Sequence, residues 1–173
     1  MVEVIGHRGA STEAPENPLA ANDLAFQQKA DGIEVDVRLT KDNRLVCMHD
    51  KSAFRTAGKK NLIKESTLNQ LKSLDVGKWK GEKWSGEAIP SLHEVLSEMP
   101  LDKKIFIDVK EGIETIPTHL RFLKSVHASQ SYSIKREHNL LLHQFLNVNL
   151  VCEHPVLSSS SELELVSSSV RHS

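Results

Sequence analysis

The stretch Gly32-Ile33-Glu34-Val35-Asp36-Val37 alternates apolar and acidic residues, a pattern typical of a β-strand. Alternate side chains of a strand point to opposite faces, so the apolar residues share one face and Glu34 and Asp36 share the other. The apolar face suits a strand covered by helices. Two carboxylates crowded onto a buried face repel each other, so they need a cation or basic partners. A hard divalent cation, Mg²⁺ or Ca²⁺, is the simplest solution, because both prefer carboxylate oxygens. The alternative is an edge strand whose acids face water.

Composition favours one soluble globular domain without a strong charge bias. The 173 residues are 39% hydrophobic and 26% charged, with a formal net charge of -1, which gives no reason to expect a nucleic-acid partner. The N-terminus does not resemble a signal peptide, and no apolar run approaches the roughly 20 residues that span a bilayer. Cys47 and Cys152 lie far apart, which agrees with a reducing compartment. We therefore expect a soluble, cytoplasmic protein without a transmembrane segment.

Strand and helix patterns alternate through the first two thirds of the chain. We predict strands at 2–6, 32–37, 45–48 and 104–110, and helices at 19–29, 66–74 and 90–96. Ser91, followed three residues later by Glu94, is typical of a capped helix start. Such alternation predicts parallel strand pairing with right-handed crossovers, and hence an α/β fold.

Each of the four predicted strands ends in polar residues that can carry chemistry. These pairs are His7 and Arg8, Glu34 and Asp36, His49 and Asp50, and Asp108 and Lys110. Parallel pairing would gather all four strand ends on one rim of the sheet, where α/β proteins place their ligands. The sequence therefore predicts one site built from separate segments.

The other segments carry weaker signals. Trp79 and Trp84 lie in a Gly- and Lys-rich loop at 77–86, where packing is the favoured role and covering a substrate the alternative. We predict a helical segment of uncertain fold at 113–157 and a Ser-rich, disordered tail at 158–173.

The motifs together resemble the bacterial-type glycerophosphodiester phosphodiesterases over about residues 2–112. The matching stretches are Gly6-His7-Arg8-Gly9, Pro15-Glu16-Asn17, Ala30 to Val37, Thr40-Lys41-Asp42, His49-Asp50 and Ile107-Asp108-Val109-Lys110. The resemblance implies a TIM barrel of the phosphatidylinositol-phospholipase-C-like superfamily. Residues 1–112 would form its N-terminal half, with a small insertion at about 51–90.

The resemblance also implies a reaction and a role for each matching residue. The family cleaves glycerophosphodiesters, its small-molecule substrates, to glycerol 3-phosphate and an alcohol. His7 and His49 match its acid/base pair, and Arg8 and Lys110 match groups that hold the phosphate. Glu34, Asp36 and Asp108 match its ligands for a divalent metal, Mg²⁺ or Ca²⁺. A cation and two basic side chains would neutralise a phosphodiester, and histidine titrates near neutral pH.

This chain departs from the family pattern in length and in three residues, one of which is Pro18 in place of the usual Thr after Pro-Glu-Asn. Asp108 stands where the family usually has Glu, and Asn43 where it usually has Gly. Eight βα units take about 250 residues, so the resemblance implies an incomplete barrel whose open edges would favour self-association. Two alternatives follow. The chain is a truncated, non-catalytic remnant that binds phosphate or a partner chain, or it has a lysophospholipase D-type activity.

Overall fold

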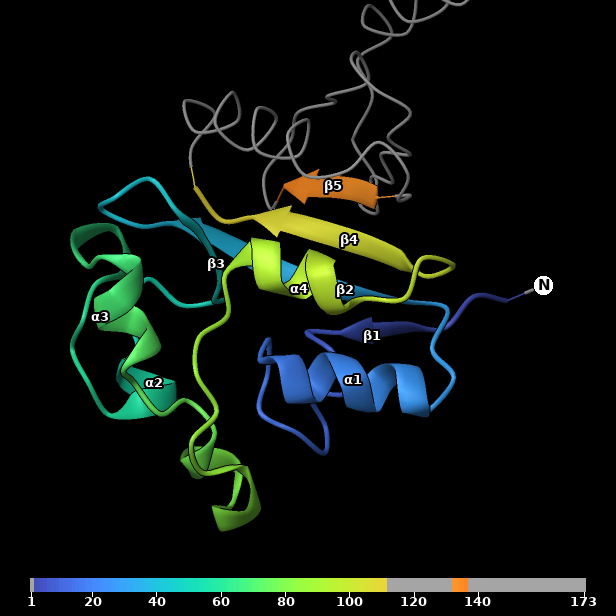
Figure 1. Cartoon of the computed structure of the whole chain (residues 1–173), viewed down its shortest axis with the longest axis horizontal. Helices are drawn as coiled ribbons and strands as arrows, with labels where there is room; N and C mark the ends of the chain where they lie inside the picture. The colour runs from blue at the N-terminus through green and yellow to red at the C-terminus, as the bar shows by residue number, and fades with distance from the viewer. Residues whose placement is uncertain (1, 112–131, 137–173) are drawn as a thin grey trace, which may run out of the picture.

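The computed structural model describes residues 2–111 and 132–136, which form a five-stranded sheet with helices (Figure 1). The strands are β1 (Ile5–His7), β2 (Gly32–Leu39), β3 (Leu45–Cys47), β4 (Lys104–Val109) and β5 (Tyr132–Arg136). The α-helices are α1 (Leu19–Gln27), α2 (Phe54–Ala57), α3 (Leu68–Lys72) and α4 (Leu92–Glu98). Short 3₁₀ turns lie at Ile63–Glu65, Lys78–Lys80 and Glu82–Trp84.

The sheet has the order β1-β2-β4-β5, and these four strands are parallel, as the alternation predicts. The parallel prediction is wrong for β3, which pairs with β2 in antiparallel register, Val37 opposite Cys47. The turn at 40–43 is too short for a parallel crossover, and Asn43 adopts φ 56° within it. Asn is the residue other than Gly that best tolerates this conformation, which accounts for its presence here.

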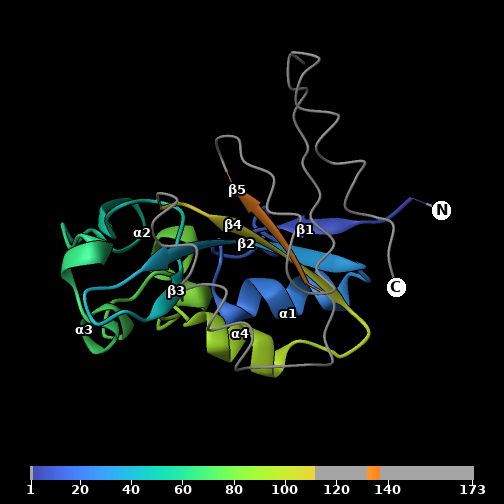
Figure 2. The ribbon, with the colours of Figure 1, turned by 90° about the horizontal axis from the view of Figure 1, so that it is seen from above.

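One face of the sheet is closed by α1 and α4 (Figure 2). Ile33, Val35 and Val37 of β2 are fully buried in one apolar cluster that also contains Ala25 of α1 and Val95 of α4. The predicted apolar face of the 32–37 strand is therefore confirmed. The predicted cap of α4 is also confirmed, since Ser91 and Glu94 form a reciprocal capping box.

A second apolar cluster holds the segment between β3 and α4. Val46 and Met48, whose side chains alternate with Leu45 and Cys47, are buried there with Ile63 and Leu71. Thr67 caps α3 through a capping box with Gln70. This cluster gives residues 51–90 a core of their own beside the sheet.

The tryptophan loop is tied to its surroundings through its indole N–H groups. Trp79 donates to the carbonyl of Val76 at 2.8 Å, and Trp84 donates to the carbonyl of Glu13 at 3.2 Å. The second bond joins the loop to the segment that follows β1. These bonds support the packing role, although 42% of Trp79 remains exposed.

The segment at 113–157, predicted as helical with an uncertain fold, contains a strand at 132–136. These residues form β5, which pairs with β4 in parallel and covers the edge that a four-stranded prediction leaves open. The strand was missed because only Tyr132 and Ile134 of its five residues are apolar, which is too short an alternation to indicate a strand. The rest of 113–157, the tail at 158–173 and Cys152 lie outside the described residues. Within the described part of the chain, no helix has the length and hydrophobicity needed to cross a bilayer.

Candidate metal centre and active site

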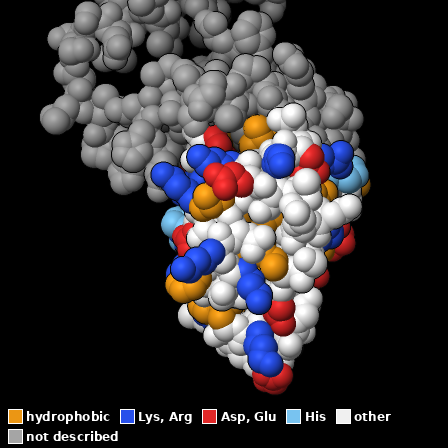
Figure 3. Space-filling model, turned by 90° about the vertical axis from the view of Figure 1, so that its left-hand side faces the viewer, with side chains coloured by type: hydrophobic (Ala, Val, Ile, Leu, Met, Phe, Trp, Pro, Cys, Tyr) orange, Lys and Arg blue, Asp and Glu red, His pale blue; other side chains and the backbone are white. Residues whose placement is uncertain are grey.

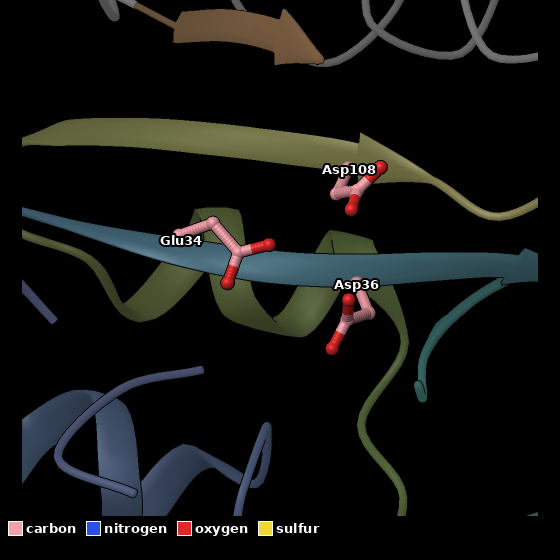
Figure 4. Close-up of side chains that lie close together, drawn as sticks. All are labelled: Glu34, Asp36 and Asp108. Carbon is pink, nitrogen blue, oxygen red and sulfur yellow. The ribbon is translucent and has the colours of Figure 1, made fainter. Parts of the chain in front are cut away.

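Three carboxylates meet on the face of the sheet opposite the apolar cluster (Figure 4). Glu34 and Asp36 come from β2, and Asp108 comes from β4, where the parallel register sets it directly beside Asp36. One oxygen from each lies within 4.8 Å of the others. Asp36 is 1% exposed and Asp108 is 7% exposed. The edge-strand alternative, with acids in water, is therefore wrong.

Two basic side chains contact these carboxylates. Lys110 Nζ lies 2.8 Å from Asp108 Oδ2 and 3.1 Å from Asp36 Oδ1. Arg8 Nε lies 3.0 Å from Asp36 Oδ2, and the Arg8 backbone N–H donates to Glu34 Oε2 at 3.1 Å. Three carboxylates thus face two cations, which leaves an excess of negative charge in a buried place.

The electrostatics of the cluster favour a further cation. Burial, and then repulsion by Asp36, raise the pKa of Glu34 to about 7. The buried oxygen Asp108 Oδ1 has no hydrogen-bond partner among the described residues. A divalent ion would lower the energy of the ionised acids, and the all-oxygen donor set suits Mg²⁺ or Ca²⁺. The cluster therefore fits a hard divalent cation, and Asp108 is long enough to join it.

Asn17 holds the central carboxylate of the cluster. Its side-chain amide donates to Asp36 Oδ2 at 3.0 Å, and its carbonyl oxygen accepts from the Asp36 backbone N–H at 3.1 Å. The residue is buried and has φ 73°, a conformation that asparagine tolerates. The Pro15-Glu16-Asn17 motif was noticed in the sequence, but nothing in its spacing indicates a bond to residue 36.

His7 lies at the solvent-exposed edge of the acidic cluster, next to Glu34. Its Nε2 atom is 3.8 Å from Glu34 Oε2, and 69% of its side chain is exposed. Partial burial and the neighbouring Arg8 lower the pKa of His7, so the ring is largely neutral at pH 7 and can accept a proton. The turn that carries it packs against α1, where a side chain at Gly9 would lie 2.6 Å from the backbone of Ala21.

His49 reaches the same rim although β3 runs antiparallel. The preceding residue, Met48, donates its backbone N–H to the Asp36 carbonyl at 2.8 Å. The His49 ring contacts Asp50 through Nδ1 at 2.7 Å, and its backbone carbonyl accepts from Arg38 Nε and Nη2 at 2.9 and 2.6 Å. The hairpin therefore brings His49 back along β2 to the level of Asp36, beside the acidic cluster.

All seven residues singled out in the sequence lie in this region, either in the acidic cluster or linked to it by the contacts above: His7, Arg8, Glu34, Asp36, His49, Asp108 and Lys110. Sequence reasoning missed three of their supporting partners. These are Asn17, Arg38 and Arg55, which contact Asp36, His49 and Asp50 at separations of 19, 11 and 5 positions. Arg55 also contacts Glu16, 39 positions away. An arginine close in sequence to the His49-Asp50 pair could have indicated a supporting role, but such neighbours are too common to identify Arg38 or Arg55 from the sequence.

Comparison with known proteins places this site in a family. The profile of the glycerophosphoryl diester phosphodiesterase family matches residues 7–148, well beyond the limit near 112 that the motifs indicated. A glycerophosphodiester phosphodiesterase of Caldanaerobacter subterraneus is 47% identical over 116 residues, covering 66% of this chain and 47% of the relative. One from Bacillus subtilis is 29% identical over 174 residues, covering 94% of this chain and 58% of the relative. The chain spans about half the length of the curated relatives it matches.

Solved structures give the same result for the fold. A phosphodiesterase of Oleispira antarctica, in complex with the product sn-glycerol-3-phosphate, has a TM-score of 0.73 and 32% identity. A glycerophosphodiester phosphodiesterase of Agrobacterium tumefaciens has a TM-score of 0.70 and 29% identity. Each match covers 80% of this chain and 58% or 59% of the solved chain. The sheet described here is thus part of a TIM barrel, and the chain belongs to the glycerophosphoryl diester phosphodiesterase family.

Proposed function

We propose that this chain hydrolyses glycerophosphodiesters to glycerol 3-phosphate and an alcohol, with a divalent cation as cofactor. The observation that carries the proposal is the cluster of Glu34, Asp36 and Asp108, with its excess negative charge, beside two histidines and two basic residues. Residues 1–112 would supply the N-terminal half of the barrel, and 51–90 would be its insertion.

The three carboxylates would hold the cation, which supplies positive charge beside the phosphate oxygens when it is bound. Arg8 and Lys110 already lie against the cluster, so each can bind a phosphate oxygen that enters it. Positive charge fixed around the phosphate stabilises the negative charge that develops in the transition state.

His7 and His49 would move the protons. One takes a proton from the attacking hydroxyl, and the other protonates the leaving alkoxide. The lowered pKa of His7 keeps that ring neutral at pH 7, the form a base requires. The Asp50 carboxylate can only accept at His49 Nδ1, so Nδ1 carries the proton and Nε2 is left for proton transfer.

The test is an assay of purified chain with glycerophosphocholine and Mg²⁺ or Ca²⁺, in which released glycerol 3-phosphate is measured. We expect release that EDTA abolishes and that Glu34→Gln lowers by at least 100-fold. Glu98→Gln makes the same chemical change at an exposed position of α4 and serves as the control.

Absence of EDTA-sensitive release from a folded wild-type chain would contradict the proposal and favour the non-catalytic remnant. Release of choline from lysophosphatidylcholine, without cleavage of glycerophosphocholine, would instead favour the lysophospholipase D-type activity. Analytical ultracentrifugation of the same sample tests the predicted self-association.

A further inference from the structure

Arg55, in α2, joins two segments of the site that are far apart in the sequence. Its Nε atom donates to Asp50 Oδ2 at 2.7 Å. Its two terminal nitrogens donate to the two oxygens of Glu16, at 3.1 Å from Nη1 to Oε2 and 2.5 Å from Nη2 to Oε1. One planar guanidinium therefore holds two carboxylates, one of them by a pair of parallel bonds.

Each of these carboxylates contacts a residue assigned above to the reaction. Asp50 uses its second oxygen for His49 Nδ1 at 2.7 Å. Glu16 Oε1 also accepts from Arg8 Nη1 at 3.3 Å, and Arg8 Nε lies 3.0 Å from Asp36. A continuous chain of contacts thus runs from His49 through Arg55 to Arg8 and the acidic cluster.

The charges and packing around Arg55 support this arrangement. Partial burial alone would raise the pKa of Asp50, but hydrogen bonds from Arg55 and His49 lower it below its usual range, so Asp50 stays ionised at neutral pH. The Trp79 ring lies 5.8 Å from the guanidinium carbon and limits its movement. Lysine could replace the charge but not the three directed N–H groups.

The surface around this contact has no single dominant charge. Figure 3 shows the side of the molecule that carries α2 and α3, where Lys and Arg side chains lie beside Asp and Glu side chains. An arginine in such a setting can be an ordinary surface ion pair, which would hold loops together and leave the reaction unaffected. The contacts to Asp50 and Glu16 distinguish Arg55 from such a surface ion pair. Asp50 also contacts His49, and Glu16 also contacts Arg8.

We propose that Arg55 is a positioning residue, which fixes the tautomer and direction of the His49 ring through Asp50 and the direction of the Arg8 guanidinium through Glu16. This inference rests on the proposed function. It assigns a role to a residue outside the acidic cluster and outside the acid/base pair.

The test compares Arg55→Gln and Arg55→Lys with Arg44→Gln, which makes the same change in the exposed turn after β2. We expect Arg55→Gln to lower kcat by 10- to 100-fold while the melting temperature falls by only a few degrees, because 42% of the Arg55 side chain is exposed. Arg55→Lys should retain most of the defect. A kcat within twofold of Arg44→Gln in both Arg55 variants would overturn the proposal.

A second measurement does not depend on activity. Two-bond ¹H–¹⁵N spectra report which ring nitrogen of a histidine is protonated, and His49→Gln identifies the signal. We expect His49 to be protonated at Nδ1 in the wild-type chain and to become a mixture of tautomers in Arg55→Gln. An unchanged His49 signal in Arg55→Gln would overturn the proposal. An inactive wild-type chain whose His49 signal still responds would count against the proposed hydrolysis and support the positioning role.

Discussion

The two faces of β2 differ in whether their side chains have all the packing and polar partners that they need. On one face, Val35 and the other apolar residues are buried against α1 and α4, and this packing is sufficient to stabilise them. On the other, Glu34 and Asp36 are held beside Asp108 at the cost of mutual repulsion, and Asp108 Oδ1 lacks a hydrogen-bond partner among the described residues. The comparison teaches that one strand can use its apolar face for stability and its acidic face for binding.

Loss of a reacting histidine is expected to have the largest effect. His49→Ala should lower kcat for glycerophosphocholine by about 10²–10⁴-fold, because it removes a proton-transfer group. The side chain is 30% exposed, so the melting temperature should change little. Steady-state kinetics and a thermal melt of the same sample check both statements. A large loss of stability would show that the charged face also supports the fold.

Truncation on the apolar face should act in the opposite way. Ile107 is 1% exposed and lies next to Asp108 in β4. Ile107→Ala should lower the free energy of unfolding by about 2–5 kcal/mol, through lost burial and the cavity left behind. Urea denaturation measures this change. A cost below 1 kcal/mol would mean that this face is less tightly packed than the burial indicates.

Glu34→Gln should stabilise the metal-free protein at high pH. The folded pKa of Glu34, about 7, lies above its ordinary value of 4.5, so its contribution to stability is present below pH 4.5 and lost as pH rises through 7. The glutamine variant lacks this loss and should be more stable at pH 8 by up to about 3 kcal/mol. Urea denaturation in EDTA at pH 5 and pH 8 measures it. Equal stability of both proteins at pH 8 would contradict the raised pKa of Glu34, which burial and then repulsion by Asp36 cause.

The smallest effect is expected at the capping box of α4, which lies on the apolar side. Ser91→Ala removes the hydroxyl that accepts from the Glu94 backbone N–H, and should cost about 1 kcal/mol. Activity should be unchanged, because α4 covers the face opposite the carboxylates. A loss of activity without loss of stability would mean that the two faces are coupled.

Much of both faces could be predicted from local sequence. The alternation at 32–37 and at 104–110 has a period of two, so it sorts apolar from acidic residues without knowledge of the partner strands. Parallel register then sets Asp36 beside Asp108. The acidic cluster follows from these two facts, which is why its three members were found.

The contacts that support the site could not be predicted in this way. Asn17 binds Asp36 across 19 positions, and Arg55 binds Glu16 across 39, and no periodicity links residues at such separations. The antiparallel direction of β3 depends on a turn whose length, rather than its composition, excludes a crossover. The strand β5 has only Tyr132 and Ile134 as apolar residues, so its alternation is too short to be recognised from the sequence.

The most direct test of the central claim is cation binding at the acidic face. Isothermal titration of the metal-free chain with Mg²⁺ and with Ca²⁺ should show one site per chain for at least one of them. Glu34→Gln should weaken that site at least tenfold, and Glu98→Gln should leave it unchanged. The account would be contradicted if the folded wild-type chain bound neither cation, or bound one equally well after Glu34→Gln.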